Sequence, residues 1–428
     1  MARESKNNLS VNEYVKKCKA LGSTYGLAAI KALLDVLDNP QDKIRVIHVA
    51  GTNGKGSTCE FLTNSLVACG YKVGTYTSPQ VFDYFERFRI NGQNIDKINY
   101  DRILGFIVAK ACDADIQVSW FELETVLAYQ LFYETSCDIA VIEAGCGGSL
   151  DATNVTKSPL AVCFTSIGLD HMAILGDTIS EIAQNKAGLI KGGSIVASSP
   201  QVEDALSVIK EACDKSGATL YQCELKRVNR QVSAYDFCWD DYHFMLKLRG
   251  KYQYINSLTS FTLLWALQEE AKLDLDLDKC VKAISNTILA GRFEEIKKGI
   301  YIDGGHNEPA ILSIKETLAA DFTNTAFTFI IGVLQDKAYA KYLPLIADMA
   351  ERIICISTSI SGRELSAGDL ADTVSSFYKG DIITCDSIEE AAKYACIYSK
   401  ENTVLAFGSL SYLNEFKNAV LEVSEYDG

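Results

Sequence analysis

The sequence predicts an α/β protein with two domains, and three observations lead to this prediction. The chain has 428 residues, which is enough for two or three hydrophobic cores. Short β-branched runs alternate with segments of helical periodicity, as in a parallel sheet covered by helices on both faces. The alternation pauses and restarts after Gly291. We therefore expect a first domain over 1–289, a linker over 290–295 and a second α/β domain over 296–428.

The first domain should begin with a helix, because apolar residues recur at helical spacing between Gly26 and Leu37 and the pair Asn39-Pro40 ends the run. The β-branched run 44–50 predicts a strand, and helical spacing resumes after a glycine-rich turn. An aromatic-rich stretch over 220–248 alternates as strands do and predicts a small antiparallel addition. Further strands of the first domain are expected at 138–144, 160–166 and 194–198.

Five short apolar strands are expected in the second domain. They lie near 300–303, 327–332, 353–357, 382–385 and 404–407. The first of them runs into Asp303-Gly304-Gly305-His306-Asn307 rather than G-x-G-x-x-G, so no dinucleotide site is expected there.

Composition and charge exclude several classes of protein. The chain is 48% hydrophobic and 22% charged, unlike fibrous or disordered chains. Its net charge of −14 repels polyanions, so nucleic acid is not an expected partner. The 14 cysteines form no C-x-x-C pair, the N-terminus has no apolar signal core, and no uncharged apolar run reaches the roughly 18 residues of a membrane span. We expect a monomeric cytoplasmic protein with reduced thiols and no membrane association.

A glycine-rich turn joins the strand 44–50 to the following helix and carries the groups that bind a triphosphate. It reads Gly51-Thr52-Asn53-Gly54-Lys55-Gly56-Ser57-Thr58. Backbone N–H groups at a helix N-terminus, one lysine and two hydroxyls suit phosphate oxygens and a magnesium ion. Because Val49 and Gly56 break the general GxxxxGK[ST] pattern, a plain glycine-rich turn with an exposed lysine is the alternative.

Three residues that follow strands are candidate metal ligands. Mg²⁺ takes one or two carboxylates in addition to phosphate oxygens, so an acid is expected near a triphosphate. Glu143 follows a buried apolar run and precedes a glycine-rich segment. Ser78 follows the strand-like run 71–75, and His171 follows the strand 160–166. The alternatives are a solvated glutamate, an ordinary turn serine before proline and a packed core histidine.

Lys186 is the most informative single residue. Thr178 and Glu181 have the spacing of a capping box, and in the helix that follows Lys186 shares one face with Ile179 and two further apolar residues. A buried ammonium group must be paired, neutralised or chemically changed. The alternative is a lysine at the edge of the apolar face, whose stem reaches out to water.

Ordered sequence blocks resemble the folylpolyglutamate synthases, often also dihydrofolate synthases, of the Mur ligase superfamily. The most specific are HVAGTNGKGS at 48–57, SLDATN at 149–154 and TSIGLDH at 165–171. The other blocks are GL..I..LL..L.NPQ at 26–41, YTSP at 76–79, ERFRING at 86–92, WFE at 120–122, IEAGCGG at 142–148, NKAGLIK at 185–191, GRFE at 291–294, DGGHN at 303–307 and DK at 336–337. The resemblance implies an N-terminal P-loop, Mur-ligase-like ATPase domain with a parallel-rich sheet and a C-terminal Rossmann-like α/β domain.

The resemblance also implies an ATP-dependent acid–amino-acid ligase. The terminal carboxylate of a folate, or of dihydropteroate, would become an acyl phosphate, which the amine of L-glutamate attacks. ATP and two Mg²⁺ ions are the implied cofactors, and Lys186 matches a lysine that family members carry as N6-carboxylysine. Because a carboxylate and a triphosphate repel each other, the metals, Lys55 and Arg292 would neutralise the transferring phosphoryl group.

Site residues follow from the resemblance position by position. Lys55, Lys186 and His171 match catalytic positions. Ser78 and Glu143 match ligands of one Mg²⁺, and His171 matches a ligand of a second. The nucleotide contacts are Gly54, Lys55, Gly56, Ser57, Asn256, Arg292 and Asp303, and the pterin-side pocket is Phe121, Leu150, Asp151 and Ala152. Because Arg292 and Asp303 lie in or beyond the linker, ATP is expected to draw the two domains together.

Departures from the family pattern concern the acceptor substrate more than the type of reaction. Ala28 stands where the family usually has an acid, and Ala29 and Ser149 stand where it has arginines. Tyr252 and Gln80 each stand where the family has a histidine. A nucleotide-binding paralogue or NTPase without folate ligase activity stays open, as does a ligase for another carboxylate acceptor. A cell-wall Mur ligase is not expected, because only 47 residues precede His48, too few for a UDP-binding domain.

Overall fold

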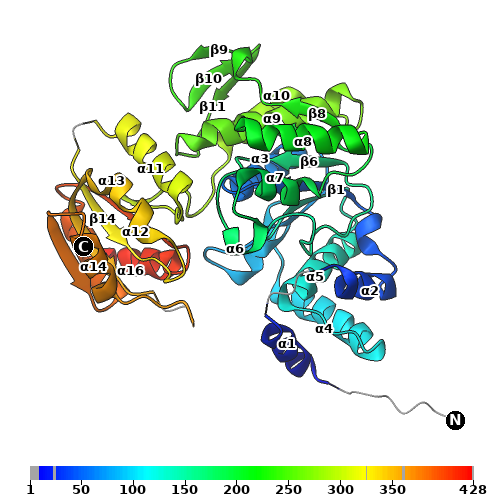
Figure 1. The fold of residues 1–428 in the computed structure, drawn as a ribbon, viewed down its shortest axis with the longest axis horizontal. Helices are drawn as coiled ribbons and strands as arrows, with labels where there is room; N and C mark the ends of the chain where they lie inside the picture. The colour runs from blue at the N-terminus through cyan, green and yellow to red at the C-terminus, as the bar shows by residue number, and fades with distance from the viewer. Residues whose placement is uncertain (1–8, 23–25, 324, 359–361, 427–428) are drawn as a thin grey trace. The chain divides into compact units, whose positions relative to one another are not determined.

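The structure, a computed structural model, describes residues 9–22, 26–323, 325–358 and 362–426. Its contacts divide the chain into two units, Met1–Met245 with Ile255–Thr287 and Leu246–Tyr254 with Ile288–Gly428. The boundary expected at 289–296 lies next to the observed division, whereas nothing in the sequence indicated that the segment before Ile255 groups with the second unit. Both units are α/β (Figure 1), so the predicted fold class is confirmed.

An eight-stranded sheet forms the centre of the first unit. Its order is β4-β3-β2-β5-β1-β6-β7-β8, in which β3 pairs antiparallel with β2 and β4 and all other pairs are parallel. The strands are β1 Arg45–Ala50, β2 Val73–Tyr76, β3 Phe88–Ile90, β4 Gln93–Asn94, β5 Ile139–Glu143, β6 Ala161–Phe164, β7 Ile195–Ser198 and β8 Thr219–Gln222. Val49 of β1 pairs with Glu143 of β5, so the carboxyl ends of these central strands meet at one edge. The four strands predicted before residue 200 are confirmed.

Helices bury the central strands of this sheet on both faces. Every residue of β5 is buried, although successive side chains point to opposite faces. On one face, Ile142 packs with apolar residues of α2, α4 and α5, and Phe164 packs with those of α7 and α8. The helices are α1 Val11–Ala20, α2 Ala28–Val36, α3 Lys55–Ala68, α4 Lys97–Asp113, α5 Trp120–Glu134, α6 Met172–Leu175, α7 Ile179–Ala187, α8 Glu203–Ser216, α9 Tyr252–Glu269 and α10 Leu277–Asn286, with 3-10 turns at Pro40–Asp42, Tyr84–Arg87 and Leu225–Arg227.

The predicted antiparallel addition is present, but it begins later than expected. It is a three-stranded sheet of β9 Val228–Gln231, β10 Asp236–Trp239 and β11 Tyr242–Met245. Residues 220–222, placed in this addition by the sequence, instead belong to β8, because they pair parallel with β7 and extend the main sheet. Trp239 and Phe244 pack against Phe261 of α9, which ties the small sheet to the unit.

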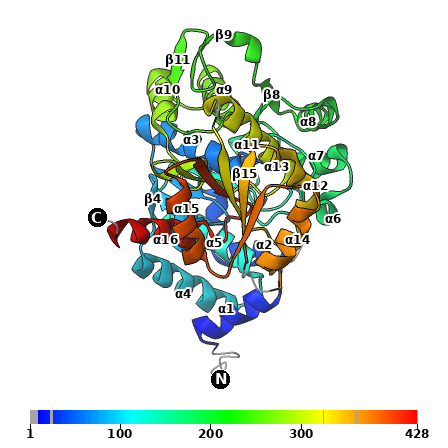
Figure 2. The ribbon, with the colours of Figure 1, turned by 90° about the vertical axis from the view of Figure 1, so that its left-hand side faces the viewer.

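The second unit holds a six-stranded sheet of order β12-β13-β17-β14-β15-β16. The strands are β12 Glu294–Lys297, β13 Ile300–Ile302, β14 Phe327–Ile331, β15 Ala350–Ile356, β16 Asp381–Cys385 and β17 Thr403–Phe407. The helices are α11 Glu308–Asp321, α12 Tyr339–Tyr342, α13 Pro344–Ala347, α14 Ala367–Ser375, α15 Ile388–Tyr398 and α16 Leu413–Tyr426. All five predicted strands are confirmed, and in Figure 2 α12 to α14 lie across β15 from α15 and α16. The edge strand β12 pairs antiparallel and is mostly charged, so its sequence carried no strand signal.

Candidate active site

The glycine-rich turn forms a tight loop between β1 and α3. Gly54 takes a φ of +86° immediately before α3, a conformation that favours glycine. A Cβ atom at Gly54 would overlap the side-chain amide of Asn256, which reaches the loop from α9. The Thr52 N–H donates to Ser166 O at 2.7 Å and fixes the loop to the end of β6. The structure therefore brings the predicted phosphate loop and Asn256 together.

The Lys55 side chain folds back over this loop. Its Nζ donates to the carbonyl oxygens of Gly51 at 3.3 Å and Thr52 at 3.1 Å. Ser57 and Thr58 are buried in the first turn of the same helix. Lys55 is thus half-buried rather than the exposed lysine of a plain glycine-rich turn, and its ammonium group lies at the loop where the helix N-terminus and the backbone N–H groups gather.

Lys186 is buried, as its place on the apolar face predicted. Its residue is 5% exposed, and Nζ donates to Gly51 O at 2.8 Å. The capping box of Thr178 and Glu181 is formed and begins the helix α7. Burial, and then the charge of Lys55, lower the pKa of Lys186 to about 8. Two ammonium groups therefore share one carbonyl oxygen, and the lowered pKa leaves a fraction of the Lys186 amine unprotonated at physiological pH although the charged form still predominates.

Glu143 and Ser78 lie side by side next to the phosphate loop. Glu143 ends β5 and is 6% exposed, so the alternative of a solvated strand-end glutamate is wrong. Its Oε2 accepts the Ser78 N–H at 3.3 Å. A Cβ atom at Gly56 would stand 3.9 Å from the same oxygen. The carboxylate therefore faces the first turn of α3.

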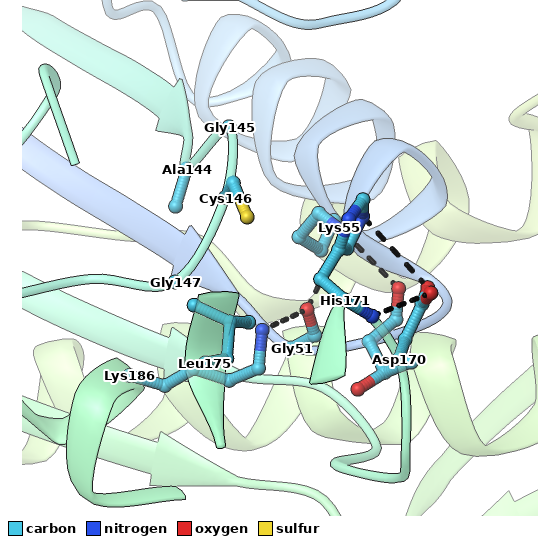
Figure 3. A pocket seen from close by; sticks show the side chains of 11 residues that line it. Gly51, Lys55, Ala144, Gly145, Cys146, Gly147, Asp170, His171, Leu175 and Lys186 are labelled. Atoms are coloured by element: carbon cyan, nitrogen blue, oxygen red, sulfur yellow. Dashed lines mark hydrogen bonds and ion pairs between the residues drawn. The ribbon is translucent and has the colours of Figure 1, made fainter. Parts of the chain in front are cut away.

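His171 and Asp170 complete a narrow pocket with Lys55 and Lys186 (Figure 3). The His171 side chain is 46% exposed, so it is no packed core histidine. Its backbone has a φ of +51°, which is strained for a residue with a side chain, and its N–H donates to Asp170 Oδ1 at 2.9 Å. The Asp170 carboxylate also lies 4.0 Å from His171 Nε2. The turn thus holds the imidazole at the pocket rather than in the core.

The donor set suits a magnesium ion that arrives with a nucleotide. Among the residues that the structure describes, no cluster of three or more His, Cys, Asp and Glu side chains stands ready for a metal. Glu143, Ser78 and His171 supply few ligands. Mg²⁺ usually keeps waters and takes one or two carboxylates together with substrate phosphates. The chemistry of these side chains therefore fits Mg²⁺ bound through phosphate oxygens.

A larger cavity of about 440 Å³ adjoins this pocket and is lined by Phe121, Leu150, Asp151 and Ala152, the four residues expected on the pterin side. Asp151 is fixed there, since its Oδ2 accepts the Cys146 N–H at 2.6 Å and its Oδ1 accepts the Thr153 N–H at 3.0 Å. Gly145 and Cys146 line both the cavity and the narrow pocket. The cavity therefore opens next to the phosphate loop.

In the second unit, Asp303 is buried in a ring of donors. Its Oδ2 accepts from Tyr252 Oη at 2.8 Å and from the Phe293 N–H at 2.9 Å, and its Oδ1 accepts from the Gly305 N–H at 2.7 Å. Burial raises the pKa of the Asp303 carboxyl, and the charge of Arg292 acts most strongly against that rise. Tyr252, a departure from the family pattern, thus orients Asp303 through its hydroxyl.

Two domain families match the chain. The Mur ligase middle domain matches residues 49–264, and the Mur ligase, glutamate ligase domain matches residues 291–410. The Bacillus subtilis protein named dihydrofolate synthase/folylpolyglutamate synthase is 31% identical over 413 residues, which cover 92% of this chain and 94% of that protein. The chain belongs to the folylpolyglutamate synthase/dihydrofolate synthase family. It is therefore an acid–amino-acid ligase.

Solved structures of the family share the whole fold. Escherichia coli FolC in complex with DHPP and ADP is 27% identical with a TM-score of 0.84, over 98% of this chain and 99% of that one. An FPGS–AMPPCP–folate complex is 27% identical with a TM-score of 0.81, over 96% of this chain and 100% of that one. The predicted Mur-ligase-like architecture is thereby confirmed. Among the described residues, no helix combines the length and apolar character needed to cross a membrane.

Sequence reasoning missed several residues at this folylpolyglutamate synthase-like site. Cys146 and Asp170 line the narrow pocket. Both lie inside the family sequence blocks 142–148 and 165–171, but their spacing alone did not identify them as site residues. Trp120 and Lys19 line the larger cavity, where Lys19 Nζ lies 4.7 Å from the centre of the Trp120 ring. The Trp-Phe-Glu block was the available signal for Trp120. Nothing in the sequence indicated Lys19, because it comes from a separate helix, α1.

Proposed function

We propose that this chain joins L-glutamate to the terminal carboxylate of a folate, using ATP. One observation carries the proposal: Lys55 and Lys186 converge on the phosphate loop next to Glu143, and a cavity for an organic acceptor adjoins them. The Escherichia coli and Bacillus subtilis relatives bear the names of both a dihydrofolate and a folylpolyglutamate synthase. We infer that dihydropteroate is an acceptor as well.

The chemistry requires two steps with balanced atoms. A carboxylate oxygen of the acceptor attacks the γ-phosphorus of ATP, and the bond to ADP breaks. The amine of glutamate then attacks the carbonyl carbon of the acyl phosphate, inorganic phosphate leaves, and the amine gives up a proton. Lys55 offsets the repulsion between carboxylate and triphosphate in the first step. Gly54, Gly56 and Ser57 present N–H groups at the start of α3, where phosphate oxygens are held.

Ser78 and Glu143 would hold one Mg²⁺, and His171 would take part in holding a second. Bound Mg²⁺ supplies positive charge beside the phosphate oxygens. Glu143 is anchored for this role by the Ser78 N–H, and His171 by the carboxylate of Asp170. The left-handed backbone conformation at His171 places the imidazole ring at the pocket rather than in the hydrophobic core.

Lys186 is proposed to carry an N-carboxyl group. The pKa of about 8 leaves a substantial fraction of its amine neutral at physiological pH, as attack on carbon dioxide requires. The amine nitrogen bonds to the carbon of CO₂ and releases a proton, which turns a buried cation into an anion. That anion would lie near Lys55 and would remove the repulsion between the two ammonium groups.

Nucleotide contacts are proposed for residues of both units. Asn256 stands at the loop, and its amide packs against Gly54. Arg292 and Asp303 belong to the second unit, where the carboxylate is held by three donors. We infer that ATP brings Arg292 and Asp303 to the phosphate loop. The protein is proposed to act in the cytoplasm as a monomer.

Phosphate release under omission of single substrates tests the proposed function. A ligase should release phosphate from ATP only when both a folate and L-glutamate are present, and dihydropteroate should replace the folate. Phosphate release from ATP alone, unchanged by either substrate, would show a plain NTPase. Dependence on glutamate without dependence on any pterin would show a ligase for another acceptor, in line with the departures at Ala28, Ala29 and Ser149.

A further inference from the structure

A second large cavity in the first unit has no place in the proposed reaction. Its volume is about 490 Å³, and it is walled by one face of α2, the 3-10 turn that follows, the segment 149–157 and the turn after α7. The acceptor pocket is lined by residues 150–152 of the same segment, and this cavity by Ser149 and residues 154–157. The two cavities therefore share a wall but no lining residue.

Three lysines and one aspartate line the cavity, and of the lysines only Lys157 forms an ion pair, with Asp42. Lys31 comes from α2 and Lys191 from the turn after α7, and neither forms an ion pair with a carboxylate of the described residues. Lys191 Nζ donates once, to Gly188 O at 2.9 Å, so further N–H groups stay available. Burial and the charge of Lys31 lower the pKa of Lys191. Two like charges at one cavity are unfavourable unless an anion lies between them.

The acids around the cavity are already occupied by other groups. Asp35 accepts the Asn39 side-chain amide at 3.0 Å. Asp42, just outside the lining, pairs with Lys157 at 2.9 Å. The remaining polar lining consists of amides and hydroxyls, which donate to carboxylate oxygens without adding charge. Asp35 keeps its negative charge, but three lysines line the cavity with it, and Lys31 and Lys191 form no ion pair among the described residues, so an anion entering here meets a net positive lining.

The shared wall is rigidly tied to the active site. Asn154 Nδ2 donates to Ser149 O and to Gly188 O, both at 3.1 Å. Ser149 Oγ donates to Asn185 O at 2.9 Å. Asn185 directly precedes Lys186 in α7. A molecule seated in the cavity therefore contacts the segment that lines the acceptor pocket on one side and the helix that carries Lys186 on the other.

We propose that this cavity binds a small organic anion with two or more carboxylates, held by Lys31 and Lys191. The volume lies in the range of about 300–1,000 Å³ that small-molecule pockets occupy, and a single inorganic oxyanion would leave most of it empty. Two sources share this chemistry, a free polycarboxylic acid and the glutamate tail of the product. Binding of the glutamate tail as product depends on the proposed function, whereas binding of an organic anion to this cavity does not.

Calorimetric titration of the full chain at low ionic strength tests the proposal without turnover. Citrate, tri-γ-glutamate and inorganic phosphate are the three probes, each against the wild-type chain and against Lys31→Ala and Lys191→Ala. Lys210→Ala is the matched control, because Lys210 lies exposed on α8 and lines neither of these two cavities. Thermal unfolding of each variant checks that the fold is kept. Lys191→Gln, which keeps part of the aliphatic stem and a polar end but loses the charge, provides a second variant at that position.

We expect at least one organic probe to bind the wild-type chain, with about tenfold weaker binding in either lysine variant and unchanged binding in Lys210→Ala. Tighter binding of tri-γ-glutamate than of citrate identifies the product tail as the source, and the reverse order identifies a free acid. The proposal is overturned if neither organic probe binds at millimolar concentration. It is equally overturned if Lys31→Ala and Lys191→Ala bind as the wild type does, or if phosphate binds as tightly as both organic probes.

Discussion

Replacing Lys186 by methionine is expected to stabilise the ligand-free protein at neutral pH, although it removes a central residue of the proposed site. Methionine keeps the length of the stem and removes the charge. Lys186 is 5% exposed as a residue, and among the described residues its ammonium group has no carboxylate at hydrogen-bond distance, only the Gly51 carbonyl oxygen. A buried charge without a countercharge destabilises the folded state, so its removal should raise the free energy of unfolding.

The size of the effect follows from the pKa of Lys186. Folding lowers this pKa from 10.5 to about 8, and each pH unit of that difference corresponds to about 1.4 kcal/mol. The charge therefore costs about 3 kcal/mol below pH 8. Loss of the hydrogen bond to Gly51 O offsets about 1 kcal/mol of the gain. A net stabilisation of about 2 kcal/mol is expected for Lys186→Met at pH 7.

The difference should shrink as the pH rises. Between pH 8 and 10.5 the folded state has lost the Lys186 proton while the unfolded chain still binds it, so wild-type stability increases with pH in this window. Lys186→Met lacks this group and should not follow the increase. Toward pH 10 the wild type should therefore match or exceed the variant in stability.

Guanidinium chloride unfolding in CO₂-free buffer without magnesium or nucleotide measures this difference. All three tryptophans, Trp120, Trp239 and Trp265, lie in the first unit with Lys186, so tryptophan fluorescence follows the correct unit. Lys210→Met on the exposed face of α8 controls for the chemistry of the substitution. A wild type more stable than Lys186→Met at pH 7, or a difference that does not change between pH 7 and 9.5, would refute the reasoning.

Three further predictions concern activity and ligand binding. Lys186→Ala should abolish turnover, and short-chain carboxylic acids should restore part of it, because a free carboxylate can replace the proposed N-carboxyl group; absence of rescue at any concentration contradicts that role. Gly54→Ala should weaken ATP binding at least about tenfold in calorimetry, since alanine at a φ of +86° is strained and its Cβ overlaps the Asn256 amide. The control Gly105→Ala lies in α4 with open space around its Cβ and should leave ATP binding unchanged; equal affinities for the two variants would refute the role of the loop. Addition of a non-hydrolysable ATP analogue should decrease the radius of gyration in small-angle scattering, and identical profiles would contradict domain closure.

The fold was largely predictable from the sequence because its buried strands are continuous apolar runs. The apolar run that forms β5 is buried on both faces, so its sequence pattern predicts a central strand of a parallel sheet. Residues 219–222 were harder, since β8 is an edge strand with half-exposed side chains. Its sequence fits both sheets, and only the pairing with β7 decides between them. Local pattern cannot supply that long-range choice.

Chemistry at the site was predictable where local geometry sets it. The spacing of α7 placed Lys186 on a buried face, and the structure confirms this. The meeting of Lys55 and Lys186 at Gly51 O was not predictable, because it joins residues 131 positions apart in the chain. Lys19 and the Lys31–Lys191 cavity were missed for the same reason. Each depends on how separate helices pack, which a single sequence does not encode in any short motif.

Transfer of oxygen from the acceptor to phosphate tests the proposed chemistry most directly. A folate acceptor labelled with ¹⁸O in its terminal carboxylate is incubated with the protein, ATP, Mg²⁺ and L-glutamate, and the released phosphate is analysed by mass spectrometry. An acyl phosphate intermediate predicts one ¹⁸O atom in each phosphate released, in equal amount to the amide formed. Unlabelled phosphate accompanying amide formation would contradict attack of the carboxylate on ATP.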